Sequence, residues 1–284
     1  MRSIVLAVSA LLSLSCATQR ASVFATGPKW LTEPPAPPSL KGKHVVFVAG
    51  HLNEFIPGYF DDNAAVVKEL GATSEVVRPP SPGTMDADVF LVTGATESHH
   101  EGGVILFGHS RGGASSLLTV LRRPRLILDG HVAAVIIVQG AVGGSPLADF
   151  INKVKPLRSE GIKALTTEES ERTLNAALTE LSKTLSPEEW DRVFSRIFYV
   201  RSGRMKDVPA AELAFTELLL RDAGTNDGLL VTHRQGMAFG TDLGVIDADH
   251  ASLVVTGMLS VTSVEERRAF TSALLGEVAR RLNW

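Results

Sequence analysis

Continuous apolar runs alternate with stretches of helical periodicity from residue 44 to the end of the chain. The runs are short and rich in β-branched residues, which is typical of strands buried on both faces of a parallel sheet. Such runs cover residues 44–49, 104–107 and 132–138, and less apolar strand candidates cover residues 74–77, 196–200 and 243–246. Helices are expected over residues 64–70, 114–121, 210–221 and 263–282. This alternation predicts an α/β protein with a mainly parallel sheet.

Residues 89–92 form an apolar run that fits a strand or a helix equally well by periodicity. Topology decides between them. Two parallel strands at 75–77 and 104–107 need a crossover of a dozen or more residues, which is usually helical. We therefore predict a helix over about 86–99.

The segment from 147 to 192 differs from the rest of the chain. It is polar, and no apolar strand interrupts it. Its leucines recur at helix-like spacings, and residues 166–169 resemble a capping box. We predict a helical excursion outside the sheet, whose leucines pack helices together rather than line a lipid groove. Those leucines are Leu165, Leu174, Leu178, Leu181 and Leu185.

The N-terminus has the anatomy of an export signal over residues 1–17. Arg2 supplies a positive charge, and the apolar run 4–14 is too short to span a membrane. The run leads into Cys16, as in a bacterial lipoprotein signal whose cysteine is acylated. Ordinary cleavage after Ala17 is the alternative. Both predict a chain that leaves the cytoplasm, either anchored in the cell envelope through lipidated Cys16 or secreted.

Composition limits which domain organisation, partners and metal sites are possible. Residues 18–42 are rich in proline and predict a semi-rigid linker, which leaves 43–284 as one domain. The net charge of −3 gives no electrostatic footprint for nucleic acid, so no such partner is expected. Cys16 is the only cysteine, which excludes a disulfide or a thiolate metal site in the domain.

A Gly-x-Ser-x-Gly pattern at residues 108–112 follows one predicted strand and precedes a predicted helix. Strand, sharp turn and helix together form a nucleophile elbow, which exposes one serine hydroxyl at the top of a sheet. Serine needs a base to remove its proton, and the base needs a carboxylate to orient it. Ser110, Asp227 and His250 occur in the chain order that α/β-hydrolases use.

Each of these residues has a structural alternative. Ser110 could belong to a plain strand-to-helix turn, and Asp227 lies in an Asn-Asp-Gly sequence that forms turns in any protein. His250 could bond a neighbouring aspartate in its own loop, either residue 247 or residue 249. His233 is a rival base, although it lies close in sequence to Asp227.

The chain resembles the secreted bacterial lipases of the α/β-hydrolase superfamily, typified by Pseudomonas and Burkholderia enzymes. The matching pieces are residues 108–113, 140–141, 144–150, 226–230 and His250. The resemblance implies an α/β-hydrolase fold with a helical lid or cap at about 147–192. It also favours Asp227 as the triad acid over Asp222, Asp242 and Asp247.

The oxyanion hole of such an enzyme needs two backbone N–H groups. One is expected from Arg111, directly after the nucleophile at a helix N-terminus. The other is expected from the loop after the first strand, where Gly50-His51-Leu52 stands in place of the family's His-Gly-hydrophobic triplet. We assign His51, with Leu52 as the alternative.

No metal or other cofactor is expected. The family's calcium-binding aspartate, two residues after the catalytic histidine, is replaced by Ser252. His99, His100 and Glu101 are adjacent, and adjacent histidines seldom point at one ion.

The sequence therefore predicts an exported serine hydrolase that cleaves small-molecule or lipid carboxylic esters through an acyl-enzyme. Lipase, short-chain esterase and polyester depolymerase activities would all use the same groups, because a fold does not fix a substrate. A non-catalytic binding module, or an acyl transferase of the cell envelope, is the alternative.

Overall fold

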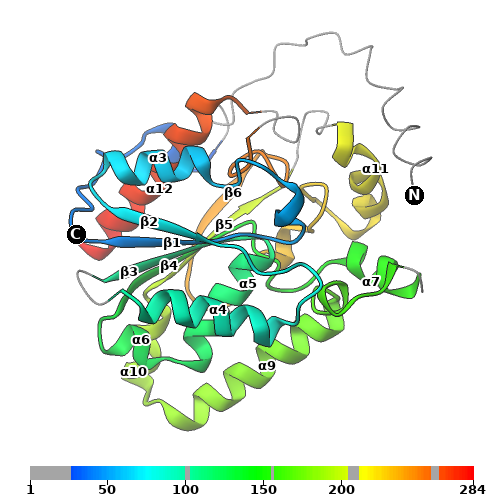
Figure 1. Cartoon of the computed structure of the whole chain (residues 1–284), viewed down its shortest axis with the longest axis horizontal. Coiled ribbons are helices and arrows are strands. Elements are labelled where there is room, and N and C mark those ends of the chain that lie inside the picture. Colours follow the sequence, from blue (N-terminus) through cyan, green and yellow to red (C-terminus); the bar gives the residue numbers. More distant parts are fainter. Residues whose placement is uncertain (1–26, 100–102, 155–156, 204–210, 257–261) are drawn as a thin grey trace.

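A single parallel sheet of six strands forms the centre of the structure (Figure 1). This computed structural model describes residues 27–99, 103–154, 157–203, 211–256 and 262–284. The strand order is β2-β1-β3-β4-β5-β6. The strands are β1 (His44–Val48), β2 (Thr73–Val77), β3 (Val104–His109), β4 (Val132–Val138), β5 (Ile197–Ser202) and β6 (Thr241–Ile246). The predicted α/β class and the parallel sheet are confirmed.

Alternate residues of the central strands enter two separate apolar cores. In β1, Val45 and Phe47 belong to the core on one face, whereas Val46 and Val48 belong to the core on the other. A strand packed on both faces has to be apolar at every position, which explains the continuous runs in the sequence. Helices therefore cover both faces of the sheet.

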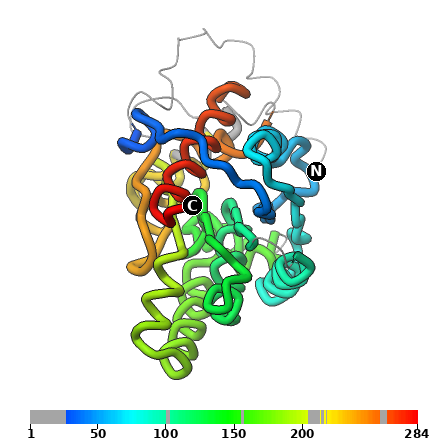
Figure 2. The backbone as a smooth tube through the Cα atoms, turned by 90° about the vertical axis from the view of Figure 1, so that its left-hand side faces the viewer, coloured from blue at the N-terminus to red at the C-terminus, as the bar shows by residue number. Residues whose placement is uncertain are grey.

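Three helices contribute to the first core, namely α2 (Lys29–Thr32), α3 (Asp61–Glu69) and α12 (Val264–Leu282). The second core lies against α4 (Met85–Glu97), α5 (Arg111–Arg122), α6 (Arg125–Leu128), α9 (Thr167–Thr184) and α10 (Pro187–Phe194). Figure 2 shows this division from the side, with the red α12 in the upper half and the yellow-green α9 and α10 at the bottom. The remaining helices are α7 (Pro146–Lys153), α8 (Glu160–Lys163) and α11 (Ala211–Leu220).

The crossover between β2 and β3 is helical, as the topology argument predicted. Helix α4 spans Met85–Glu97, and the Thr84 hydroxyl caps it by accepting a 3.2 Å hydrogen bond from the Ala87 N–H. Capping by threonine satisfies one of the free donors at a helix start. Helix α12 has a full capping box between Ser263 and Glu266, again at the predicted start.

In the part that the structure describes, the excursion between β4 and β5 consists of helices joined by short loops, and it has two parts. Helices α9 and α10 pack against α5 and α6, so they belong to the body of the domain. Four of the five predicted leucines, Leu174, Leu178, Leu181 and Leu185, join the second core, which confirms that they pack helices. Leu165 instead belongs to a small cluster beside α7 and α8.

Residues 27–42 differ from the expected linker, because they pack on the domain. Trp30 and Leu31 of α2 and the later Leu40 are buried in the first core. The Trp30 indole also donates a 2.7 Å hydrogen bond to the carbonyl of Leu243 in β6. The domain therefore begins well before residue 43. The predicted export signal and Cys16 lie outside the described residues, within which no helix is long and apolar enough to cross a membrane.

The start of α5 lies directly against the end of β1, and Gly112 makes this approach possible. A Cβ atom on Gly112 would lie 2.0 Å from the carbonyl oxygen of Val48, well inside van der Waals contact. The second glycine of the Gly-x-Ser-x-Gly pattern is thus required by packing between helix and strand.

We expect Gly112→Ala to lower the free energy of unfolding by about 3 kcal/mol or more, because backbone would have to move to admit the methyl group. Gly94→Ala in α4 is the matched control, since nothing lies within 4 Å of its Cβ position. That change should raise stability by about 0.5–1 kcal/mol. Urea denaturation of both variants measures the difference, and equal effects would contradict the packing argument.

Candidate active site

The candidate site lies where the strand order reverses. The chain passes from β1 to β2 in one direction and from β3 through β6 in the other. Ligands of open α/β sheets bind outside the carboxyl ends of the strands at such a switch point. Val48 pairs with Gly108, so His51 after β1 and Ser110 after β3 emerge side by side at this edge.

Ser110 occupies the sharp turn between β3 and α5. Its backbone has φ 57° and ψ −126°, a strained combination for any residue other than glycine. It is 9% exposed, and its hydroxyl forms no hydrogen bond with any residue that the structure describes. The turn therefore presents the hydroxyl at the N-terminus of α5, as a nucleophile elbow does.

His250 and Asp227 are brought together by the loops after β5 and β6. The His250 Nδ1 lies 2.9 Å from Asp227 Oδ2, and the His250 N–H donates a 2.9 Å hydrogen bond to the Asp227 carbonyl. The imidazole is nearly buried and the carboxylate fully so. Ser110 and His250 line one cavity, without a hydrogen bond between their side chains. Such bonds are often long in substrate-free sites and tighten when substrate is bound.

The Asp227 carboxylate is held by four further donors. The backbone N–H groups of Leu229 and Leu230 donate to Oδ1 at 3.1 and 2.8 Å. The Ser202 hydroxyl and the Gln235 amide donate to Oδ2 at 2.9 and 3.0 Å. Because a carboxylate with this many donors cannot turn freely, it fixes the orientation of the imidazole.

Gln139 connects the ends of three strands behind the site. Its amide nitrogen donates to the Ser202 hydroxyl at 2.6 Å and to the Asp249 carbonyl at 2.8 Å. Sequence reasoning missed Gln139, Ser202 and Gln235. Gln139 could have been noticed as a polar residue directly after the apolar run 132–138. Ser202 and Gln235 lie in no motif.

The rival residues lie elsewhere. His233 is exposed beside Tyr199 and Arg201, outside the cavity that Ser110 lines. Asp242 forms an ion pair with Arg201, and Asp222 is exposed. His233, Asp242 and Asp222 are therefore not placed to assist Ser110. The Asp249 carboxylate accepts hydrogen bonds from the backbone N–H groups of Ala251 and Ser252 at 3.2 and 2.9 Å.

The two expected oxyanion donors are available. The backbone N–H groups of His51 and Arg111 donate to no acceptor among the described residues. The neighbouring groups are engaged, since Gly50 N–H donates to the Tyr59 hydroxyl at 3.0 Å and Leu52 N–H donates to the Ser81 hydroxyl at 2.6 Å. This favours His51 over the alternative Leu52.

The side chain of Arg111 is buried beside the nucleophile and pairs with Asp88 of α4. Its Nε and Nη2 donate to the two carboxylate oxygens at 2.7 and 3.0 Å. Nη1 donates to the Ser81 carbonyl at 2.8 Å, and Nη2 donates to the Gly83 carbonyl at 2.6 Å. The guanidinium thus fixes the loop after β2. Ser81 of that loop in turn binds Leu52, the residue after the expected oxyanion donor His51.

Two histidines at the site are held neutral. Burial lowers the pKa of His51 to about 4, with a smaller contribution from the Arg111 charge. Burial, followed by the nearby His250, lowers the pKa of His109 well below its usual value. His109 lies between Tyr59 and the backbone carbonyl of His250, at 2.6 and 2.8 Å, and so joins the nucleophile strand to the His250 loop.

A cavity of about 730 Å³ opens at Ser110 and is lined mainly by apolar side chains. Helices α7 and α8 form one wall with Leu147, Ile151 and Ile162. Loop residues after β1, including Leu52 and Phe55, lie on the other side. A cavity of this size takes an apolar ligand group next to the serine.

Comparison with solved structures shows that the chain has the α/β-hydrolase fold. A carboxyl esterase from a metagenome superposes with a TM-score of 0.68 and 20% identity, covering 95% of this chain and 81% of its own. Mature Bacillus licheniformis lipase BlEst2 gives a TM-score of 0.57 and 18% identity, covering 77% of this chain and 86% of its own. No family model and no curated relative matches the sequence.

We expect Asp88→Ala to cost about 3–5 kcal/mol of unfolding free energy, because it leaves a buried guanidinium without its counter-charge. The exposed Asp86–Arg122 pair joins the same two helices at 2.7 Å and serves as the control. Asp86→Ala should cost less than about 1 kcal/mol.

A double variant tests whether the cost comes from the charge. Asp88→Ala combined with Arg111→Met should lose less stability than the two single losses added together. Denaturant titrations of all variants measure this coupling. Additive losses, or equal costs for Asp88→Ala and Asp86→Ala, would show that the pair does not organise the loop.

Proposed function

We propose that this protein is a serine hydrolase that cleaves carboxylic esters, with Ser110 as nucleophile, His250 as base and Asp227 as orienting acid. The observation that supports it most directly is the position of Ser110, whose backbone is strained and whose hydroxyl forms no hydrogen bond with the described residues. It lines the same apolar cavity as His250, whose ring is bound to the Asp227 carboxylate. The solved structures with the same fold include proteins named as an esterase and a lipase.

In the proposed reaction, the Ser110 hydroxyl oxygen attacks the ester carbonyl carbon while His250 Nε2 takes its proton. The N–H groups of His51 and Arg111 hold the oxyanion of the tetrahedral intermediate. Collapse breaks the bond to the alcohol oxygen, which leaves with the proton from His250. Water then attacks the acyl-enzyme by the same steps, releasing the acid and restoring Ser110.

The cavity favours esters with an apolar acyl group of medium or greater length, since a short acyl chain would leave most of its wall exposed to water. Export through the predicted signal, with or without acylation at Cys16, would place the activity outside the cytoplasm. Helices α7 and α8 are the part of the 147–192 excursion that we propose as a cap over the substrate.

A fluorophosphonate probe should label the wild-type protein, because it reacts with activated serines. Ser110→Ala should abolish labelling, and Asp227→Asn should lower ester turnover roughly 10³- to 10⁴-fold. Ser195→Ala, which changes an exposed serine of the turn after α10, should label normally. Folded wild-type protein that takes no label would instead support a non-catalytic binding module.

Acyl-chain preference tests the substrate class. With nitrophenyl esters of increasing length, kcat/KM should rise beyond acetate. Ile151→Trp, which fills part of the cavity from α7, should lower kcat/KM for the long esters roughly tenfold while sparing acetate. Val154→Trp, at the exposed end of the same helix, is the control. A preference confined to short chains in the wild type would exclude a lipase.

A further inference from the structure

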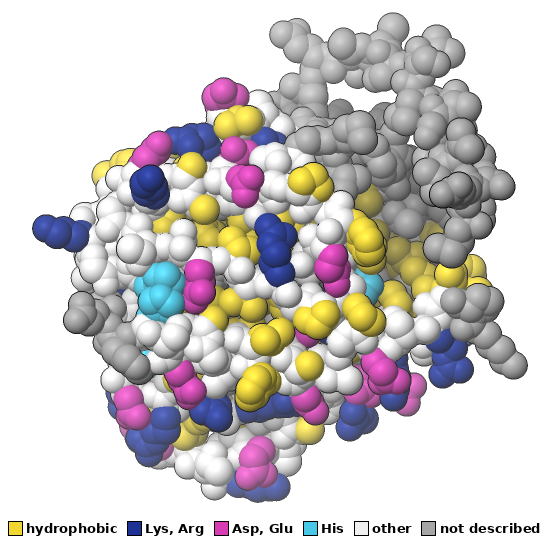
Figure 3. All heavy atoms as spheres, in the orientation of Figure 1, with side chains coloured by type: hydrophobic (Ala, Val, Ile, Leu, Met, Phe, Trp, Pro, Cys, Tyr) yellow, Lys and Arg dark blue, Asp and Glu magenta, His cyan; other side chains and the backbone are white. Residues whose placement is uncertain are grey.

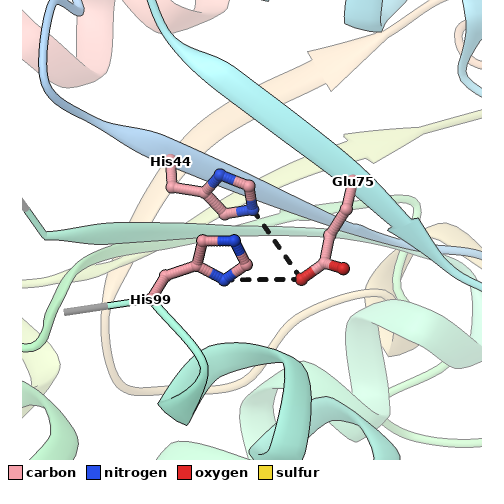
Figure 4. Close-up of side chains that lie close together, drawn as sticks. All are labelled: His44, Glu75 and His99. Carbon is pink, nitrogen blue, oxygen red and sulfur yellow. Dashed lines mark ion pairs between the residues drawn. The ribbon is translucent and has the colours of Figure 1, made fainter. Parts of the chain in front are cut away.

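A second group of chemically reactive side chains lies at the opposite end of the sheet from Ser110, where β1 begins. Figure 4 shows its members, His44, Glu75 and His99. His44 is the first residue of β1, Glu75 is in the middle of β2, and His99 follows the end of α4. A ring nitrogen from each histidine and one carboxylate oxygen of Glu75 all lie within 4.8 Å of one another. Figure 3 shows histidine and acidic side chains next to each other on this face of the molecule.

Two buried atoms of this cluster lack hydrogen bonds to the described residues. They are Nε2 of His44 and Oε1 of Glu75, which face each other at 3.7 Å. That distance is too long for a hydrogen bond. His44 is only 6% exposed, so its ring nitrogen is well removed from water. Buried polar atoms without partners are rare in folded proteins, and each calls for a cause such as an ion.

The other nitrogen of His44 is already held. Nδ1 lies 2.7 Å from the hydroxyl oxygen of Thr73, the residue that begins β2. Histidines that bind metals almost always use their second ring nitrogen in this way, which fixes the tautomer and the ring orientation. When Nδ1 donates to Thr73, the lone pair of Nε2 faces the carboxylate of Glu75. Two electron-pair donors facing each other are stabilised by a cation between them.

The two distances from Glu75 Oε1 to the histidine nitrogens are close to those around a tetrahedral ion. Zn²⁺ bound at about 2.0–2.1 Å separates its ligand atoms by about 3.3–3.4 Å. Glu75 Oε1 lies 3.7 Å from His44 Nε2 and 3.6 Å from His99 Nδ1. The side chains of Glu75 and His99 are 40% and 33% exposed, so water can reach a fourth position.

Coordination requires one local change. The rings of His44 and His99 are stacked, with centroids 3.5 Å apart and planes inclined by 10°. His99 Nδ1 also contacts the Ala95 carbonyl at 3.1 Å and the Ser98 hydroxyl at 3.0 Å. The His99 ring must turn out of the stack to direct its lone pair at the ion. Its partial exposure at the end of α4 gives it room to do so.

We propose that His44, Glu75 and His99 bind a divalent transition-metal ion of the Zn²⁺ type. Two imidazoles and one carboxylate favour such an ion over Ca²⁺ or Mg²⁺, which prefer all-oxygen sites. None of the three residues lines the cavity at Ser110. The ion would join β1, β2 and the end of α4, and its role is therefore to stabilise the fold.

The test uses the full chain without a histidine tag, stripped by a chelator and titrated calorimetrically with Zn²⁺. We expect one equivalent to bind. At a hundredfold excess over the dissociation constant, the thermal midpoint should rise by roughly 5 °C. Co²⁺ in place of Zn²⁺ should give the visible absorption of a four-coordinate site. Neither readout depends on ester hydrolysis.

Variants decide whether these residues hold the ion. His99→Ala and Glu75→Gln change partly exposed side chains and should weaken binding at least tenfold. His233→Ala removes an exposed histidine elsewhere and should bind as the wild type does. No stoichiometric binding, or binding that is equal in His99→Ala and His233→Ala, would overturn the proposal.

Discussion

The buried Arg111 guanidinium joins the parts of the molecule that must keep a fixed position around Ser110. It belongs to the turn that presents Ser110, yet its side chain pairs with Asp88 in α4 and binds two carbonyls of the loop after β2. Ser81 of that loop accepts a hydrogen bond from the Leu52 N–H. Leu52 directly follows His51, the proposed oxyanion donor. A charge in this position is costly unless every donor is satisfied. The local structure therefore tolerates little movement.

Much of the fold could be predicted because its signals are local. The central strands β1, β3 and β4 were found as continuous apolar runs, since a strand covered on both faces cannot alternate with polar residues. Helix α4 was ambiguous by periodicity and became predictable from the crossover that parallel strands need. Residues 27–42 were misjudged because their prolines resemble a linker, whereas the burial of Trp30 depends on β6, more than 200 residues away in sequence.

The candidate site shows the same division between local and long-range information. Ser110 and Asp227 were predicted because each lies in a short motif. His250 was predicted because the chain order of the three residues is constrained. Gln139, Ser202 and Gln235 have no motif. Folding brings Ser202 and Gln235 to the Asp227 carboxylate, and it brings Gln139 to the Ser202 hydroxyl. These residues form hydrogen bonds around the proposed triad. A hydrogen-bonding partner has no preferred spacing in sequence, so it could not have been identified without the structure.

The cluster of His44, Glu75 and His99 was missed in the sequence for a related reason. The sequence drew attention to His99 because two reactive residues follow it directly, but neighbours on a chain rarely converge on one ion. Its partners in the structure are His44 and Glu75, which parallel pairing of β1 and β2 places near the same sheet end. Strand β1 thus begins at the proposed ion site and ends in the proposed oxyanion loop. An ion there would fix the start of β1 without contacting the reacting groups, so its removal should affect stability more than the chemistry at Ser110.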